Sequence, residues 1–138
     1  MVSTLMPGDT IVADMHAYKT RKAMPGDIVL FHHHDIVLVK RLIAIEGDSV
    51  SGKNGNISVN GAEIAEPYVS HTGDASDNMN NFGPIKVPVG EIFVLGDNRD
   101  VSLDSRLPEF GNVTNQDIAG KALYIVTSKQ DRTGRRVR

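Results

Sequence analysis

Several features are missing from this chain of 138 residues, and each absence narrows what the protein can be. Cysteine does not occur, which excludes disulfide bonds and thiolate metal sites. Tryptophan is absent, and only three tyrosines and four phenylalanines are present, so we expect no aromatic platform for stacking nucleic-acid bases. The charges nearly cancel, at a formal net −2, so no overall electrostatic field attracts a nucleic acid.

Long hydrophobic runs are also missing. No run approaches the roughly 18 apolar residues that a membrane-spanning helix needs, and the N-terminus lacks the basic start and apolar stretch of a secretory signal. We therefore expect the chain as given to be soluble. Residues 129–138 are locally basic and predict a solvated, frayed terminus, with contact to an anionic membrane surface as the alternative.

What the chain does contain is a succession of β-strand signals. Short segments rich in β-branched residues, bounded by Gly, Asp, Asn or Pro, occur at residues 10–15, 26–33, 35–48, 56–61, 85–90, 91–97 and 121–128. Asn54-Gly55 predicts a hairpin with a type I′ turn. Residues 114–122 predict one short helical turn opened by Thr114, and the polar residues 71–83 predict an exposed loop. The fold class expected is mostly β, with antiparallel sheets and few or no helices.

The dipeptide Gly-Asp recurs at strand boundaries. It stands at Gly8-Asp9, Gly26-Asp27, Gly47-Asp48 and Gly96-Asp97. Both residue types are favoured in turns, so for the first three positions we predict turn chemistry and no direct chemical role.

Lys40 is the residue that asks for an explanation, because it interrupts the apolar run "VLVKRLIAI" of residues 37–45. Side chains alternate along a strand, so Lys40 shares its face with Leu38 and Leu42, while Arg41 points to the other face. Three interpretations are open: an edge strand with the amine in water, a buried ion pair, or an amine whose pKa is lowered by burial so that it acts as a general base. The natural client of such a base is a serine hydroxyl.

The polar stretch "GDNRDVSLDSR", residues 96–106, supports the third interpretation. It follows an apolar strand directly and mixes acids, guanidinium groups and hydroxyls. This density suits a self-satisfied network in which carboxylates hold arginines bidentately. One of its serines is then available for a hydrogen bond with a nearby amine.

Taken together and in order, these segments resemble the type I signal peptidases, membrane-bound Ser-Lys endopeptidases that remove signal peptides from exported proteins. "MVSTLMPGDTIV" resembles the end of the family's nucleophile box, "PGDIVLF" the next box and "VLVKRLIAIEGD" the lysine box. "VLGDNRDVSLDSR" resembles the most distinctive box, and "ISVNG", "EPYV" and "FGPIKVPVGEIFVLGDN" fill the intervals.

The resemblance implies a role for particular residues. Lys40 matches the general base, and Ser102 matches the serine that orients that lysine. The charged network behind the site would consist of Arg41, Asp97, Arg99, Asp104 and Arg106. Shallow pockets for the small residues of an Ala-x-Ala motif would be lined by Met1, Leu5, Ile11, Leu30, Leu38 and Val39.

The chain also departs from the family pattern. Ser3 falls where the family usually has proline, so the nucleophilic serine would immediately precede Met1, and the chain would begin just after it. The spacing of Ser3 does not suit a nucleophile. Ala44 and Glu46 replace the usual glycine and proline of the lysine box. One catalytic domain over residues 1–138 is expected, with the second lobe of some relatives reduced to a small β excursion around residues 48–90.

By resemblance, the function expected is signal-peptide removal after an Ala-x-Ala-type motif on the extracytoplasmic face of a bacterial membrane. Its partners would be signal peptides and the lipid surface, with no nucleic acid, metal or cofactor; His32 and His34 are too few for a zinc site. The chain without its serine would be inactive. The alternatives are a catalytically dead relative that binds exported proteins, and a self-cleaving Ser-Lys relative of the repressor kind, for which no DNA-binding helices are seen.

Overall fold

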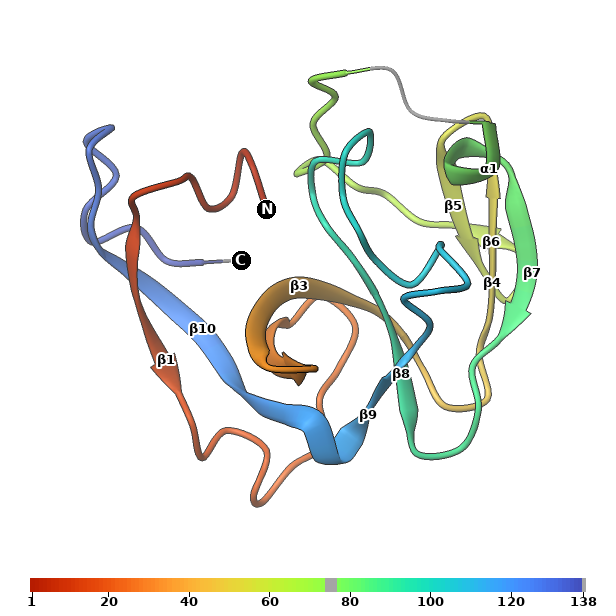
Figure 1. Ribbon diagram of the computed structural model, residues 1–138, viewed down its shortest axis with the longest axis horizontal. Coiled ribbons are helices and arrows are strands. Elements are labelled where there is room, and N and C mark those ends of the chain that lie inside the picture. The colour runs from red at the N-terminus through yellow and green to blue at the C-terminus, as the bar shows by residue number, and fades with distance from the viewer. Residues whose placement is uncertain (74–76, 138) are drawn as a thin grey trace.

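Two antiparallel sheets make up the protein in the computed structural model, which describes residues 1–73 and 77–137 (Figure 1). The larger sheet has the strand order β1 (Thr10–Asp14), β10 (Ile118–Thr127), β2 (Ile28–His33), β3 (Ile36–Ile45), β8 (Glu91–Leu95) and β9 (Val113–Thr114). The smaller sheet has the order β6 (Ala62–Glu63), β5 (Asn56–Val59), β4 (Ser49–Lys53) and β7 (Phe82–Lys86). The smaller sheet stands to one side of the larger one and is formed between β3 and β8 in the chain. The predicted fold class is confirmed.

Helical structure is confined to two short pieces of the described chain, α1 (Asp77–Asn80) and the 3-10 turn Asn115–Asp117. Thr114 precedes that turn as predicted, and its hydroxyl donates to the Asp117 carboxylate at 2.8 Å. The turn is shorter than expected, because the chain enters β10 at Ile118. No helix in residues 1–73 and 77–137 is long and apolar enough to cross a membrane.

The expectation of an exposed loop over residues 71–83 is only partly correct. Met79, in α1, is buried, and β7 already begins at Phe82. Phe82 stacks on the buried Phe93 of β8 with 6.1 Å between ring centroids, which ties this stretch to the core. Residues 74–76 lie outside the described part of the chain.

Three of the four Gly-Asp dipeptides form the same turn. The glycines have φ angles of 91°, 93° and 89° at positions 8, 26 and 47, where a side chain would be strained. In each turn the aspartate carboxylate accepts a hydrogen bond from the backbone N–H three residues earlier, in the pairs Asp9–Met6, Asp27–Met24 and Asp48–Ile45. The predicted turn chemistry is confirmed at these positions, and the fourth dipeptide serves another purpose.

The predicted hairpin is also present. Asn54 and Gly55 have φ angles of 50° and 83°, and Lys53 pairs with Asn56 across the turn. Two consecutive positive φ angles are the signature of the type I′ turn that an Asn-Gly pair favours.

Buried side chains gather on both faces of the larger sheet. Leu42, Phe31 and Val94 belong to one cluster, while Ala44, Val50 and Phe93 belong to a second that joins the two sheets. A bulge between Leu42 and Ala44 in the pairing with β8 interrupts the strict alternation of β3, so these two residues, two positions apart, belong to different clusters.

The expectation of a solvated, frayed terminus is only partly correct: most of residues 129–136 are exposed, but the segment is packed at Val137. Val137 is 6% exposed and joins a third cluster with Ile28, Ala122 and Ile125. Its N–H donates to the Leu123 carbonyl at 2.8 Å, so the segment after β10 folds back along that strand. The two chain ends therefore lie near one another (Figure 1), and Arg132 binds the carbonyls of residues 3 and 4 at 2.9 and 3.0 Å.

Gly52 in β4 allows the smaller sheet to pack. A Cβ at this position would lie 2.3 and 2.6 Å from ring carbons of Phe82, whose ring is held against Phe93. We expect Gly52→Ala to lower the free energy of unfolding by about 1–3 kcal/mol, as overpacking does, measured by urea denaturation. Gly73→Ala is the matched control, because its Cβ would meet nothing closer than 3.6 Å. Equal stability of the two variants would contradict this account of the packing.

Candidate active site

The amine of Lys40 donates a hydrogen bond to the hydroxyl of Ser102, with 2.8 Å between Nζ and Oγ. The two residues are 62 positions apart in the chain and meet because β3 and β8 are neighbouring strands. β3 lies between β2 and β8, so the edge-strand interpretation of Lys40 is wrong. Nor does a salt bridge join Lys40 to a carboxylate within the described residues, which removes the second interpretation.

Burial lowers the pKa of the Lys40 amine below its ordinary value of 10.5. The charges around the amine partly cancel, because the carboxylates of Asp104 and Asp97 raise its pKa while the Arg106 guanidinium lowers it. Loss of water around the charged form is thus the main cause. A lysine in this state gives up its proton more readily than one in water.

Gly96 makes the contact between Lys40 and Ser102 possible. A Cβ at Gly96 would lie 2.1 Å from the Ser102 hydroxyl oxygen and 3.4 Å from the Lys40 nitrogen. This fourth Gly-Asp dipeptide is therefore a point of close approach, unlike the three turns. The sequence carried a usable signal, since this dipeptide alone leads into the polar stretch of residues 96–106.

Arg41 and Asp97 form a buried pair on the opposite face of β3. The Nε and Nη2 atoms of Arg41 each lie 2.8 Å from an oxygen of Asp97, and the two residues are 2% and 0% exposed. The Thr4 hydroxyl also donates to the Asp97 carboxylate, which ties the N-terminal segment to the pair. Thr4 was not expected at the site, because its neighbours in the sequence carry no charge to suggest it.

Asp104 and Arg106 form a second buried pair, behind Ser102. Nε and Nη2 of Arg106 lie 2.8 and 2.9 Å from the carboxylate of Asp104, which also accepts the N–H of Gly96 at 3.1 Å. Arg106 donates to the Arg99 carbonyl as well, at 2.8 Å. These bonds close residues 96–106 into a compact loop around Ser102.

The loop is nevertheless not self-satisfied, which corrects the prediction. Arg99 pairs with Glu66, at 2.7 Å between Nη1 and Oε2, and Asp100 pairs with His71 at 2.6 Å. Both partners lie more than two dozen positions upstream, in the connection between β6 and α1. Of the charged residues of the loop, only Asp104 and Arg106 form an ion pair with each other.

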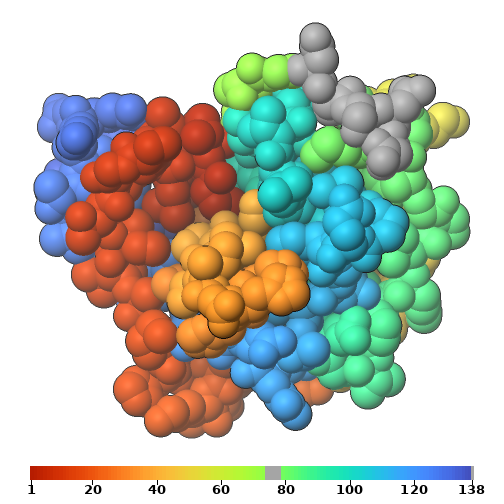
Figure 2. All heavy atoms as spheres, viewed as in Figure 1, coloured from red at the N-terminus to blue at the C-terminus, as the bar shows by residue number. Residues whose placement is uncertain are grey.

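A cavity of about 380 Å³ opens beside Lys40 and Ser102. Its other walls are mostly apolar: Met1, Val2, His33, Ile36, Leu38, Asn98, Val101, Leu103 and Phe110. Figure 2 shows the β2–β3 hairpin in orange between the red N-terminal segment and the cyan loop after β8, the three segments that line this cavity. No carboxylate of the described residues lines it.

The six residues expected to line pockets for small side chains fall into two groups. Met1 and Leu38 line the cavity with Lys40. Met1 also joins the other four, Leu5, Ile11, Leu30 and Val39, which are half-buried against the third cluster. Met1 thus connects the two groups, and its amino group lies close enough to Lys40 for burial and the lysine charge to lower the pKa of that amine.

The histidine run 32–34 ends a strand and makes a turn. His33 ends β2 and stacks on Phe110 with 4.4 Å between ring centroids, while His34 has a φ of 52°. Within residues 1–73 and 77–137, no group of three His, Asp or Glu side chains is placed to hold a metal ion.

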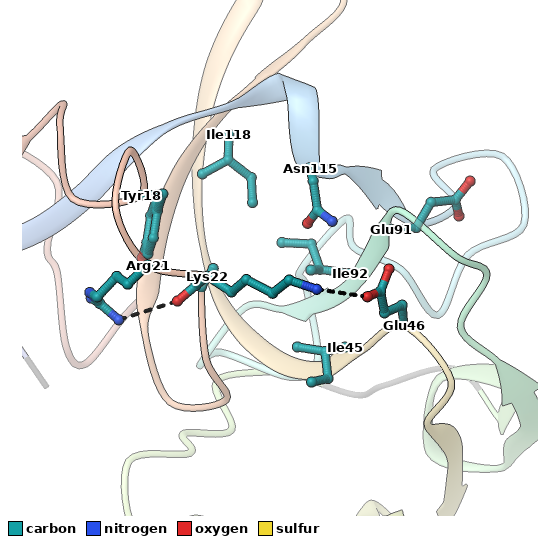
Figure 3. Close-up of a pocket in the computed structure, with 10 residues that line it drawn as sticks. Tyr18, Arg21, Lys22, Ile45, Glu46, Glu91, Ile92, Asn115 and Ile118 are labelled. Atoms are coloured by element: carbon teal, nitrogen blue, oxygen red, sulfur yellow. Dashed lines mark hydrogen bonds and ion pairs between the residues drawn. The ribbon is translucent and has the colours of Figure 1, made fainter.

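A second cavity, of about 300 Å³, contains none of the residues predicted for the site (Figure 3). Lys22 reaches across it to Glu46 at 3.0 Å. The N–H of Gly90 and the Lys22 ammonium hold the pKa of the Glu46 carboxyl below its ordinary value. The replacement of the usual family proline by Glu46 thus creates an ion pair at this cavity, away from Lys40.

Known proteins resemble this chain in sequence and in structure. The family described as "Signal peptidase, peptidase S26" matches residues 1–127. Signal peptidase I S of Bacillus subtilis (strain 168) is 40% identical over 106 residues, 72% of this chain and 57% of that protein. Signal peptidase I P of Bacillus subtilis subsp. natto is 35% identical over 132 residues, 91% of this chain and 70% of that protein.

Among solved structures, a signal peptidase I from Enterococcus faecalis V583 matches with a TM-score of 0.62 and 28% identity. The match covers 73% of this chain and 97% of that one. Against the Bacillus subtilis (strain 168) relative, the chain spans little more than half the length, 57%.

Burial of Lys40 predicts a particular pH dependence of stability. Below the lowered pKa the amine is charged in both the folded and unfolded states, and the folded state bears the cost of its burial. We expect Lys40→Met to be more stable relative to the parent at neutral pH than at high pH. The difference in stability between Lys40→Met and the parent should narrow as the pH rises from the lowered pKa of Lys40 toward 10.5. In this pH range the folded amine is neutral and the unfolded amine is still protonated.

Urea denaturation at several pH values measures this difference. Lys86→Met is the matched control, because Lys86 is exposed on β7. A difference for Lys40→Met that does not change with pH would show that burial does not perturb this amine.

Proposed function

This chain belongs to the signal peptidase family, peptidase S26, and on that premise we propose that it is the extracytoplasmic catalytic part of a serine endopeptidase that removes signal peptides from exported proteins. The membership confirms the family resemblance seen in the sequence. One observation carries the proposal: a half-buried lysine amine, with its pKa lowered, is held by a serine hydroxyl at 2.8 Å.

Lys40 is the general base in this proposal. A neutral amine accepts the proton of a serine hydroxyl as that oxygen attacks the carbonyl of the scissile bond. Lys40 then protonates the leaving amine and, in the second half of the reaction, activates the water that releases the acyl group. Its lowered pKa makes the neutral form accessible at a lower pH than for a lysine in water.

The nucleophile would be a serine immediately before Met1. Support comes from the position of Met1, whose amino group marks where a preceding residue would attach and lies near Lys40. A backbone N–H near that serine, together with an upstream hydroxyl, would hold the oxyanion. Without those residues the chain would be inactive.

Ser102 would orient the base. Its hydroxyl accepts a hydrogen bond from the amine, and Gly96 leaves room for this contact. The buried pairs Arg41–Asp97 and Asp104–Arg106 would hold the strand and the loop at this distance, with Arg99 contributing through its own pair. Rigid ion pairs around a site hold the reacting groups at a fixed distance and in a fixed orientation.

The substrate would lie extended along the strands near Met1, in the manner of an added β-strand. The half-buried aliphatic residues Leu5, Ile11, Leu30 and Val39, with Met1 and Leu38, would form shallow walls that accept alanine and exclude larger side chains. The exposed aliphatic residues Ile36, Val101 and Leu103 around the cavity suit an enzyme that works at a lipid surface on the extracytoplasmic side.

The alternative is a catalytically dead relative that binds or positions exported proteins. In this proposal Ser3 does not supply the nucleophile, because its spacing from Gly8-Asp9 does not suit one. The codons before Met1 distinguish the two functions. A serine codon there, preceded by a hydrophobic span, supports the peptidase; another residue at that position supports the dead relative.

We expect the chain, extended by its natural upstream residues, to cleave a peptide that carries Ala-x-Ala. Lys40→Ala should lower kcat/KM by about 10²–10⁴-fold, the usual contribution of a general base. In the parent, kcat/KM should rise with pH until the lowered pKa of Lys40 is passed. Undiminished turnover by the Lys40→Ala protein, assayed by chromatography of the products, would rule out Lys40 as the base.

Ser102→Ala tests the orienting role separately. Loss of the hydroxyl should reduce kcat by a smaller factor than Lys40→Ala, because the base remains but is held less firmly. The circular dichroism spectrum should be unchanged. If kcat of the folded Ser102→Ala protein equals that of the parent, Ser102 does not orient the base.

A further inference from the structure

The segment Glu66–Ser70 leaves the smaller sheet after β6 and runs beside the loop that carries Ser102. The N–H of Ser70 donates to the Asp97 carbonyl at 2.9 Å, and the N–H of Arg99 donates to the Ser70 carbonyl at 3.1 Å. These two bonds form a parallel β-bridge between Ser70 and Asn98. The segment is therefore paired with the loop through the backbone, and three of its side chains extend the contact.

Tyr68 covers the guanidinium group of Arg41. The central carbon of that group lies 3.6 Å from the centroid of the tyrosine ring, while its nitrogens hold Asp97. A planar guanidinium that stacks on a ring and binds a carboxylate in its own plane is constrained in every direction. Since Arg41 follows Lys40 directly, Tyr68 also limits the movement of the strand at the lysine.

Glu66 holds the other arginine of the loop. Its carboxylate binds both terminal nitrogens of Arg99 and accepts the Tyr68 hydroxyl at 2.9 Å. The Arg99 side chain is 2% exposed and the Glu66 side chain 9%, so the pair is shielded from water. Burial and the Glu66 carboxylate raise the pKa of Tyr68, which keeps its hydroxyl a proton donor.

Ser70 reaches the N-terminal segment. Its hydroxyl donates to the Val2 carbonyl at 2.6 Å. One short stretch thus contacts the residue next to Lys40, the loop of Ser102 and the residue next to Met1, where the nucleophile is proposed to attach.

We propose that Glu66, Tyr68 and Ser70 are positioning residues, which hold the Lys40 strand, the Ser102 loop and the N-terminal segment in a single register. This inference rests on the proposed function and deepens it. If residues 66–70 only connected the smaller sheet to the site, they would not need to contact the Lys40 strand, the Ser102 loop and the N-terminal segment. We therefore call residues 66–70 the clamp. This segment starts at the smaller sheet and extends from there to the site.

The clamp acts on Lys40 by keeping water out. The amine is hydrogen-bonded to Ser102, and the charged groups close enough to act on it are Asp97, Asp104, Arg106 and the amino group of Met1. All but Met1 belong to the loop that the clamp pairs with. If the loop moves away, water reaches the amine and its pKa returns toward 10.5.

A pair of Tyr68 variants tests the clamp without any cleavage assay. Nuclear magnetic resonance of side-chain ¹³C-labelled lysine gives the pKa of Lys40 in the chain as it stands. Tyr68→Leu removes the stacked ring and should raise that pKa by about one unit. Tyr68→Phe keeps the ring, loses only the bond to Glu66, and should leave the pKa near its parent value. A folded Tyr68→Leu protein with an unshifted Lys40 would overturn the proposal.

Ser70 provides a second test that does not depend on Tyr68→Leu being folded. In the chain extended with its upstream residues, Ser70→Ala should lower kcat with little change in KM, and Ser70→Thr should restore it by returning the hydroxyl. Equal kcat for Ser70→Ala and parent would refute the positioning role of Ser70. If the extended parent itself fails to cleave, the proposed function is wrong, while the titration of Lys40 still decides whether the clamp exists.

Discussion

The hydrogen bond between the half-buried amine of Lys40 and the hydroxyl of Ser102 is the central contact of the candidate active site. An ammonium group loses hydration when it is buried, and here one hydroxyl at 2.8 Å is its hydrogen-bonded partner. That arrangement lowers the pKa of the amine only while the surrounding atoms exclude water. Gly96 leaves room for this contact. The two neighbouring strands and the polar loop hold Lys40 and Ser102 at this distance and shield the amine from water.

Three buried ion pairs surround this hydrogen bond, and all three are bidentate. Arg41, Arg99 and Arg106 are almost fully buried, and each binds a carboxylate through two nitrogens. Removing one partner from such a pair leaves an unpaired charge in the interior, so the pairs are costly to disturb. What they contribute is a fixed geometry, since a bidentate guanidinium allows little rotation. The second layer around Lys40 is therefore rigid, although charge–charge attraction contributes little net stability.

Much of the site was predictable from local patterns. The alternation of side chains along a strand placed Lys40 and Arg41 on opposite faces, and the loop of residues 96–106 was recognisable from its composition alone. Glu66, Tyr68 and Thr4 were not, because each acts on a partner at least 27 positions away. The packed C-terminus was missed for a related reason, since its basic composition conceals Val137, whose burial depends on β10 and β2.

Local sequence patterns predict the mostly β class, the Gly-Asp and Asn-Gly turns, and the opposite facing of Lys40 and Arg41, because these follow from backbone preferences and the two-residue period of a strand. The half-burial of Lys40, the contact of its amine with Ser102 and the binding of Arg99 from outside its own loop depend on the tertiary structure. The physical reason is that burial and pairing are properties of several segments at once. Strand neighbours brought together by the order β2-β3-β8 create them, and no single stretch of chain contains that information.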